Sequence, residues 1–217
     1  MSARRRTAIL ISGRGSNMRS LIEAARAPDF PAEIALVASN RPDAPGLAMA
    51  KQAGIATAAV DHKIYAGREE FEASLQKLLD IHRIELICLA GFMRMFTGGF
   101  VERWSERLIN IHPALLPAYR GLHTHERALA DGVKIHGCTV HFVVPGLDEG
   151  PIIAQTAVPV LDNDNAETLA ARVLEQEHVL YPQALRIVAS GDYSVDGNRV
   201  RSNPASGNKH LLNSSQA

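Results

Sequence analysis

The sequence is poor in cysteine and carries no excess of charge of either sign. Its 217 residues include only two cysteines, Cys88 and Cys138, and no C-x-x-C pair. Both lie in apolar, strand-like runs, so we interpret them as buried thiols of a reducing cytoplasm, not as a disulfide or zinc ligands. Basic and acidic residues both total 23. This balance argues against a large nucleic-acid surface, which usually shows a basic excess.

Long hydrophobic runs are missing as well. No apolar stretch approaches the length of a membrane span, and the short apolar run after Arg4-Arg5-Arg6 lacks the layout of a secretion signal. We therefore expect a cytoplasmic protein with no membrane partner. The expected organisation is a solvated basic lead (1–6), a single domain (7–190), a hairpin (191–200) around Asp196-Gly197, and a disordered tail (201–217) rich in Asn and Ser.

Apolar strand-like runs alternate with amphipathic helical stretches along most of the chain. Strands are predicted at 7–12, 34–39, 55–60, 84–90 and 108–111, and helices at 45–53, 67–81, 97–104, 126–130 and 166–188, besides one after residue 17. This order predicts an α/β fold with a Rossmann-like, mostly parallel sheet flanked by helices, and a C-terminal β-hairpin region completing the site. Two β-rich runs, 137–144 and 151–158, predict a hairpin or bent loop that presents Asp148. Pro182 is expected to kink or interrupt the last helix.

The first strand leads into a glycine-rich turn, residues 12–17 (SGRGSN). Free N–H groups at the start of the following helix are suited to a phosphate. A dinucleotide site is disfavoured because the G-x-G-x-x-G fingerprint needs glycine where this chain has Met18, and no acidic residue closes the second strand. A plain strand-to-helix turn stays open as an alternative.

Asn110 and His112 are two residues apart on a predicted strand, so their side chains share one face. An amide donor beside an imidazole suits a carbonyl oxygen that becomes negative during a reaction. A buried, hydrogen-bonded histidine is the alternative. The apolar loop at residues 91–96 follows another buried strand, where open sheets bind ligands. It could hold a flat aromatic ligand or form part of the core.

Six motifs in order resemble the phosphoribosylglycinamide formyltransferase family, over about residues 7–200. They are SGRGSN (12–17), LAGFMR (89–94), NIHPALLP (110–117), GLHTH (121–125), TVH (139–141) and LDEGP (147–151). The resemblance implies formyl transfer from 10-formyltetrahydrofolate, as co-substrate, to the amine of glycinamide ribonucleotide in purine synthesis, without a metal. It does not decide between a monomer and a homodimer.

The same resemblance implies roles for individual residues. The catalytic residues would be Asn110, His112 and Asp148, with the acid favouring the charged form of the histidine. The remaining implied residues are Gly15, Ser16, Asn17 and Glu177 for the phosphoribosyl substrate, Arg68, Met93, Arg94, Met95, Phe96 and Val143 for the folate, and Thr139 and His141 as supports of the site.

Other functions remain open at this point. His123 and His125 could suggest a metal, but no third ligand has a clear spacing. A formyltetrahydrofolate deformylase and a non-catalytic phosphate- or nucleotide-binding α/β module are the two competing hypotheses. The chain also departs from some members of the family, with Ala114 for Ser, Glu149 for Gly and Phe96 for Leu.

Overall fold

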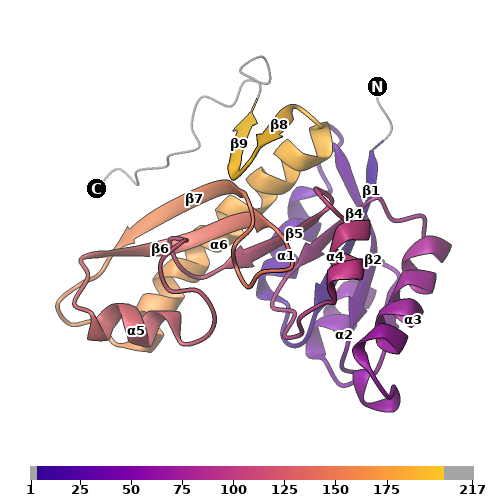
Figure 1. The fold of residues 1–217 in the computed structure, drawn as a ribbon, viewed down its shortest axis with the longest axis horizontal. Coiled ribbons are helices and arrows are strands. Elements are labelled where there is room, and N and C mark those ends of the chain that lie inside the picture. The colour runs from indigo at the N-terminus through magenta and orange to yellow at the C-terminus, as the bar shows by residue number, and fades with distance from the viewer. Residues whose placement is uncertain (1–3, 203–217) are drawn as a thin grey trace.

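Nine strands form one continuous sheet in the computed structural model, which describes residues 4–202 (Figure 1). The strands are β1 (Arg5–Ile11), β2 (Ala32–Ser39), β3 (Thr57–Ala59), β4 (Leu86–Leu89), β5 (Leu108–His112), β6 (Ile135–Phe142), β7 (Ile152–Pro159), β8 (Tyr193–Asp196) and β9 (Arg199–Ser202). Their order is β3-β2-β1-β4-β5-β6-β7-β9-β8. The strands from β3 to β5 are parallel, and β6 then runs antiparallel to β5 and β7 antiparallel to β6.

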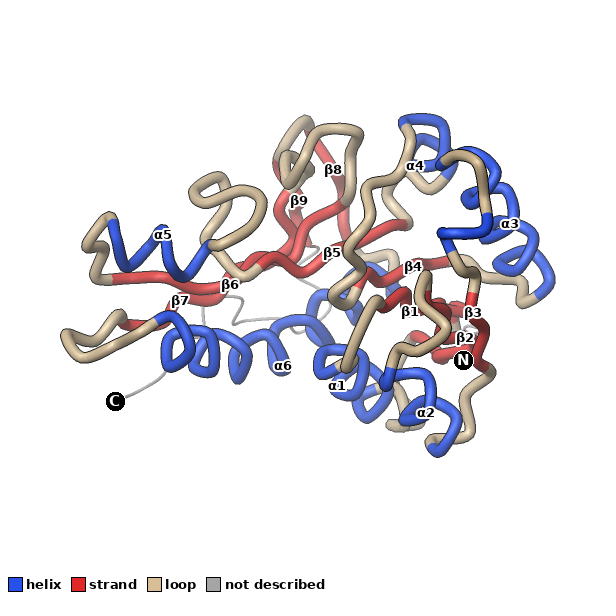
Figure 2. The backbone as a smooth tube through the Cα atoms, turned by 90° about the horizontal axis from the view of Figure 1, so that it is seen from below, coloured by secondary structure: helices blue, strands red, loops and turns tan. Residues whose placement is uncertain are grey.

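Helices cover both faces of this sheet. They are α1 (Ser16–Ala24), α2 (Pro45–Gln52), α3 (Arg68–Ile81), α4 (Gly98–Arg103), α5 (Thr124–Ala130) and α6 (Ala166–Ser190), with a 3-10 turn η1 (His62–Ile64). Figure 2 shows α1, α2 and α6 along one face, and α3 and α4 on the opposite face. The predicted α/β class with a mostly parallel, helix-flanked sheet is confirmed.

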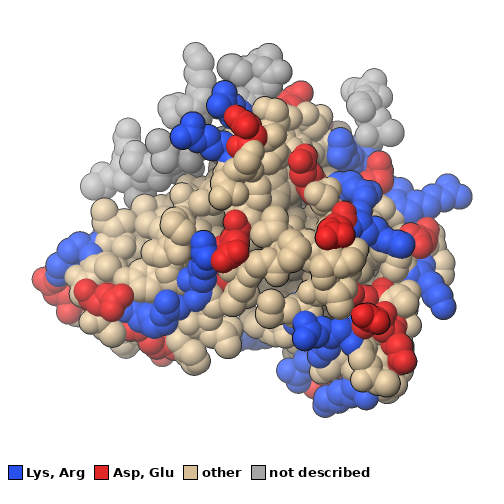
Figure 3. Space-filling view, viewed as in Figure 1, with Lys and Arg blue, Asp and Glu red and all other residues tan. Residues whose placement is uncertain are grey.

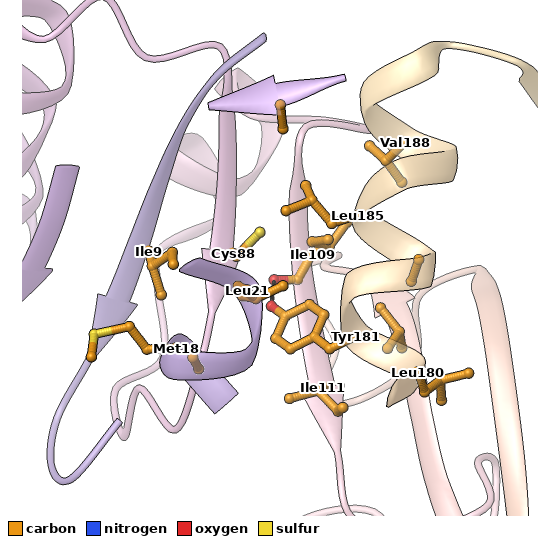
Figure 4. Close-up of a cluster of buried hydrophobic side chains, with 14 of the residues drawn as sticks. Ile9, Met18, Leu21, Cys88, Ile109, Ile111, Leu180, Tyr181, Leu185 and Val188 are labelled. Carbon is orange, nitrogen blue, oxygen red and sulfur yellow. Dashed lines mark hydrogen bonds between the residues drawn. The ribbon is translucent and has the colours of Figure 1, made fainter. Parts of the chain in front are cut away.

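The core has two apolar layers because the parallel strands are buried on both faces. Successive side chains of β1 alternate between them, Ile9 toward α1 and α6 and Leu10 toward α3 and α4. Tyr181 of α6 reaches into the first layer (Figure 4), and its hydroxyl donates to the carbonyls of Leu89 at 2.9 Å and Ile109 at 3.2 Å. The long C-terminal helix is therefore attached to β4 and β5, the strands that lead into the candidate site.

The basic lead differs from the expectation. Strand β1 begins at Arg5, and the arginines bind the protein instead of lying in solvent. Arg4 donates to the carbonyls of Ala25 and Ala32, and Arg6 donates to the carbonyl of His82 at 2.8 Å and pairs with Glu33. Guanidinium groups can satisfy several terminal carbonyls at once, which sequence periodicity does not reveal.

Two further expectations are corrected by the structure. Helix α6 is continuous through Pro182, so the expected interruption is wrong, while the expected kink stays a prediction. Buried residues on both sides, among them Leu180 and Leu185, hold the helix although one backbone hydrogen bond is lost. Strand β3 is confined to Thr57–Ala59, shorter than the predicted 55–60, since only these residues pair with β2.

The C-terminal hairpin is present as β8 and β9, but it lies away from the candidate site. It joins β7 on the side opposite β6 through a single pairing of Ile152 with Arg199. Of the hairpin residues that the structure describes, none lines the cavity presented below. The site is completed instead by the loop between β6 and β7. Strand β9 extends to Ser202, and the rest of the predicted tail, 203–217, lies outside the described residues.

Charge and hydropathy of the folded chain agree with its composition. On the face drawn in Figure 3, basic and acidic side chains are interspersed and form no field of one sign. Ion pairs also join opposite charges, as between Arg186 and Asp29 and between Arg172 and Asp164. Within residues 4–202, no helix is both long enough and apolar enough to cross a membrane.

We expect Tyr181→Phe to lower the free energy of unfolding by about 1–2 kcal/mol, because two buried carbonyls lose their shared donor. Urea unfolding would measure the change. Tyr193→Phe is the matched control, since the Tyr193 hydroxyl donates to the carbonyl of Glu106 at the surface. An effect no larger than that of the control would contradict the role of Tyr181 in attaching α6.

Candidate active site

A cavity of about 680 Å³ lies at the carboxyl ends of β4 and β5. Its walls are the loop after β4, the end of β5, residues 121–126, and the loop 143–148 between β6 and β7. This is the edge at which parallel sheets bind ligands, and the volume is that of a site for a small organic molecule. The predicted site residues that line it are Met93, Arg94, Met95, Phe96, Asn110, His112, His141, Val143 and Asp148.

Strand β5 carries Asn110 and His112, and its pairing with β6 sets their positions. Asn110 lies opposite His141, and His112 opposite Thr139. The Thr139 hydroxyl donates to the carbonyl of Ala114 at 2.6 Å and accepts from the amide of Leu116 at 3.0 Å. Thr139 of β6 therefore holds the turn after β5 in place, and it supports the site without lining the cavity.

The His112 ring lies between two oxygen atoms. Its Nδ1 is 3.4 Å from Asp148 Oδ2, and its Nε2 is 2.9 Å from the carbonyl oxygen of Tyr119. Both side chains of the ion pair are at most 10% exposed. The predicted pairing of Asp148 with His112 is thus present, while Nε2 already has a protein acceptor that the sequence did not suggest.

Asp148 is held in place by its loop as well as by the histidine. The Gly121 amide donates to Asp148 Oδ2 at 2.9 Å, and Asp148 Oδ1 is 3.8 Å from His141 Nε2. Asp148 has a φ of 52°, and Tyr119 and His123 also have positive φ values. Left-handed backbone at residues other than glycine is uncommon and collects at functional sites. Both loops that contact His112, the one with Tyr119 and the one with Asp148, contain such a residue.

His141 orients the Asn110 amide. Burial lowers the pKa of His141, which favours the neutral ring. Its Nδ1 lies 2.8 Å from the carbonyl oxygen of Phe142 and so donates there, which leaves Nε2 as an acceptor. Asn110 Nδ2 is 3.3 Å from that Nε2. One amide hydrogen of Asn110 therefore points to His141, and the other is available to a ligand.

The glycine turn forms a second, separate part of the site. Gly15 has a φ of 74°, a left-handed conformation that favours glycine, and a Cβ there would lie 3.0 Å from Met18 Cε. Ser16 begins α1. Asn17 Nδ2 donates to Glu177 Oε2 at 2.6 Å, and burial raises the pKa of Glu177. The four residues predicted for the phosphoribosyl substrate are thus brought together, beside the cavity rather than in its walls.

The residues predicted for the folate are divided between two places. Met93 and Met95 are 70% and 53% exposed at the cavity mouth, while Phe96 is buried and stacks on Phe92 and Phe100. Arg68 lies at the start of α3, in a separate surface hollow next to Glu70 and Thr97. Its assignment to the folate stays a prediction.

Sequence reasoning missed the backbone contributions of Tyr119 and Gly121, because a carbonyl or amide has no residue-type signature. His125, interpreted from the sequence as a loop or substrate-contact residue, lines the cavity and packs against His136, with ring centroids 5.2 Å apart. The GLHTH motif was the available signal for this segment. Among the residues that the structure describes, no group of three or more His, Cys, Asp or Glu side chains is arranged to hold a metal ion.

Comparison with known proteins decides the family, because the model of the family described as "Formyl transferase" matches residues 5–185. The chain belongs to the formyl transferase family. The resemblance inferred from the ordered motifs is confirmed.

Individual relatives of this chain support the same family assignment. It is 42% identical to the phosphoribosylglycinamide formyltransferase of Escherichia coli over 88% of its own length and 90% of that protein. It is 48% identical to the trifunctional purine biosynthetic protein adenosine-3 of Gallus gallus, of whose length it spans about a fifth (19%). The structure of glycinamide ribonucleotide transformylase 1 from Symbiobacterium toebii superposes with a TM-score of 0.90 at 44% identity, over 93% of this chain and 95% of that one.

We expect the formyl transferase to lose stability as the pH falls from about 6.5 toward 4. Burial lowers the pKa of His136 to about 4, and burial also lowers the pKa values of His125 and His141. In this range the unfolded chain binds more protons than the folded chain, so acid favours unfolding. Thermal unfolding at several pH values measures the effect. His136→Gln should show a smaller fall in Tm, and a Tm that rises on acidification would contradict the sign.

Proposed function

We propose that this protein transfers the formyl group of 10-formyltetrahydrofolate to the amine of glycinamide ribonucleotide, a step of purine biosynthesis. The observation that carries the proposal is the contact of Asp148 with His112, 3.4 Å apart, in the wall of a cavity that also exposes Asn110. Family membership and the names of the near-full-length relatives support the same activity.

The two substrates are assigned to the two parts of the site. The cavity, with the exposed Met93 and Met95 at its mouth, suits the flat apolar rings of the folate. The glycine turn at the start of α1 suits the phosphate of the ribonucleotide, because free amides and the helix dipole attract an anion. Asn17, the last residue of this turn, is assigned to the phosphate as well, and Glu177, which accepts from Asn17, is assigned to the ribose.

In the reaction, the amine nitrogen attacks the formyl carbon and a new C–N bond forms. The carbonyl oxygen becomes an oxyanion, and the free amide hydrogen of Asn110 donates to it. The bond from carbon to N10 then breaks, the amine loses a proton and N10 gains one. His112, held by Asp148, donates a hydrogen bond to the oxyanion, and a water positioned by Asp148 carries the proton from the amine to the departing N10.

His112 Nε2 can take part only when the Tyr119 carbonyl releases it. That carbonyl lies on a loop whose Tyr119 and His123 have positive φ values, and the substrate oxygen would take its place as acceptor. The unliganded arrangement keeps the ring oriented and satisfied until the substrate arrives. Donation of a hydrogen bond from His112 Nε2 to the oxyanion, as inferred from the sequence, therefore requires the loop that carries Tyr119 to move.

A formyl-transfer assay tests the proposal. The purified chain with 10-formyltetrahydrofolate and glycinamide ribonucleotide should release tetrahydrofolate at a rate that depends on the ribonucleotide, and formyl-glycinamide ribonucleotide should accumulate. Release of formate independent of the ribonucleotide would identify a deformylase. Binding of the ribonucleotide without turnover would identify a non-catalytic module.

Asn110→Ala and His112→Ala should each lower kcat about 100-fold or more while the protein stays folded, since each removes a group that stabilises the oxyanion. Asp148→Asn keeps an acceptor for the Gly121 amide but removes the charge, and it should also lose most turnover. His82→Ala, at the end of α3 on the opposite edge of the sheet, is the control. Near-native kcat in any of the three site variants would remove that residue from the mechanism.

A further inference from the structure

A chain of buried polar groups crosses the carboxyl edge of the sheet beside the site. It runs from His62 in η1 through Asn40 after β2 and Ser12 after β1, and it ends on the backbone amide of Met93 in the loop after β4. The strand order β3-β2-β1-β4 makes these four segments neighbours. None of the roles described above uses Ser12 or Asn40, which are 6% and 3% exposed.

The direction of the hydrogen bonds is determined at Ser12. Its hydroxyl is 2.6 Å from Asn40 Oδ1, which only accepts, so the single hydroxyl hydrogen goes to Asn40. The hydroxyl oxygen then accepts from the Met93 amide at 2.8 Å. The backbone carbonyl oxygen of Asn40 lies 2.8 Å from His62 Nδ1. Both partners of Ser12 lose a buried hydrogen bond if the hydroxyl is removed.

Ser12 stands at the junction of the two parts of the site. It is the first residue of the SGRGSN turn, and Met93 lines the cavity. On its other side the turn is held by α2, where the Gly46 amide donates to the carbonyl of Gly13 at 3.1 Å. A Cβ at Gly46 would lie 2.5 Å from Ile11 Cδ1, so this approach also depends on glycine. The turn is therefore also held from the α2 side. Ser12 joins it to the cavity loop twice, through its backbone amide, which donates to the Gly91 carbonyl at 3.1 Å, and through its hydroxyl, which accepts from the Met93 amide.

We propose that Ser12 is a positioning residue that couples the phosphate-binding turn to the cavity loop, so that each substrate strengthens the binding of the other. A phosphate held by the turn restricts the motion of Ser12. Because the Met93 amide donates to the Ser12 hydroxyl, the cavity loop then becomes more ordered as well. Such coupling is reciprocal, because each ligand must raise the affinity of the other by the same factor. The inference rests on the proposed function, which supplies the two ligands.

Calorimetric titrations of the full chain test the coupling, with tetrahydrofolate as a non-reacting folate and glycinamide ribonucleotide as the second ligand. In the wild-type chain each ligand should bind about fivefold or more tightly in the presence of the other. In Ser12→Ala the factor should fall to about one, and tetrahydrofolate alone should bind about three- to tenfold more weakly. In the transfer assay the KM for the folate should rise more than kcat falls.

Thr7→Ala is the matched control, because Thr7 carries a buried hydroxyl on β1, the strand that leads into Ser12, and donates locally to the carbonyl of Arg5 at 3.1 Å. It should lower Tm and leave the coupling factor unchanged. Asn40→Ala is the second variant, which leaves the Ser12–Met93 bond without its anchor and should reduce the factor partly. This variant decides the question if Ser12→Ala does not fold.

The outcomes separate the inference from the proposed function. A folded Ser12→Ala with the wild-type coupling factor overturns the inference alone, and so does a wild-type chain that binds both ligands independently. A wild-type chain that binds neither ligand overturns the proposed function together with the inference. A coupling factor lost in Ser12→Ala and kept in Thr7→Ala supports the positioning role.

Discussion

The site depends on one buried contact, that between the carboxylate of Asp148 and the imidazole of His112. A carboxylate that is largely withdrawn from water is stable only when it is paired and hydrogen-bonded. The Gly121 amide and the His112 ring meet this need together. The antiparallel β6 ends beside the start of β5, where the Val143 amide donates to the Leu108 carbonyl at 2.9 Å. The loop that follows β6 then brings Asp148 to His112 at the other end of β5.

The same edge gathers the rest of the site. Parallel strands bring their carboxyl ends together, so the glycine turn after β1, the apolar loop after β4 and the end of β5 are adjacent although they are far apart in sequence. The polar groups there are linked in short chains, one from Asn110 through His141 and one from Met93 through Ser12 to Asn40. Apolar layers on both faces of the sheet hold these chains rigidly in place.

Many of the strands and helices, and part of the candidate site, were predictable from patterns of residue type. Strand runs, helix starts such as that at Pro45, and the shared face of Asn110 and His112 follow from periodicity and were found. The expectations that were wrong concern contacts made by tertiary structure. The Arg4–Arg6 group binds carbonyls, and α6 continues through Pro182 because packing on both sides outweighs one lost hydrogen bond. Arg68 lies in a hollow separate from the cavity, and its assignment to the folate stays a prediction.

The sequence by itself determined the α/β class and the family through its ordered motifs, and it proposed a set of candidate site side chains, since these follow from residue identity and spacing. Only the tertiary structure decided how they meet. It placed the Tyr119 carbonyl on His112 Nε2, the Gly121 amide on Asp148 and the Met93 amide on Ser12. The physical reason is that backbone amides and carbonyls are the same in every residue, so the fold alone selects which of them become partners.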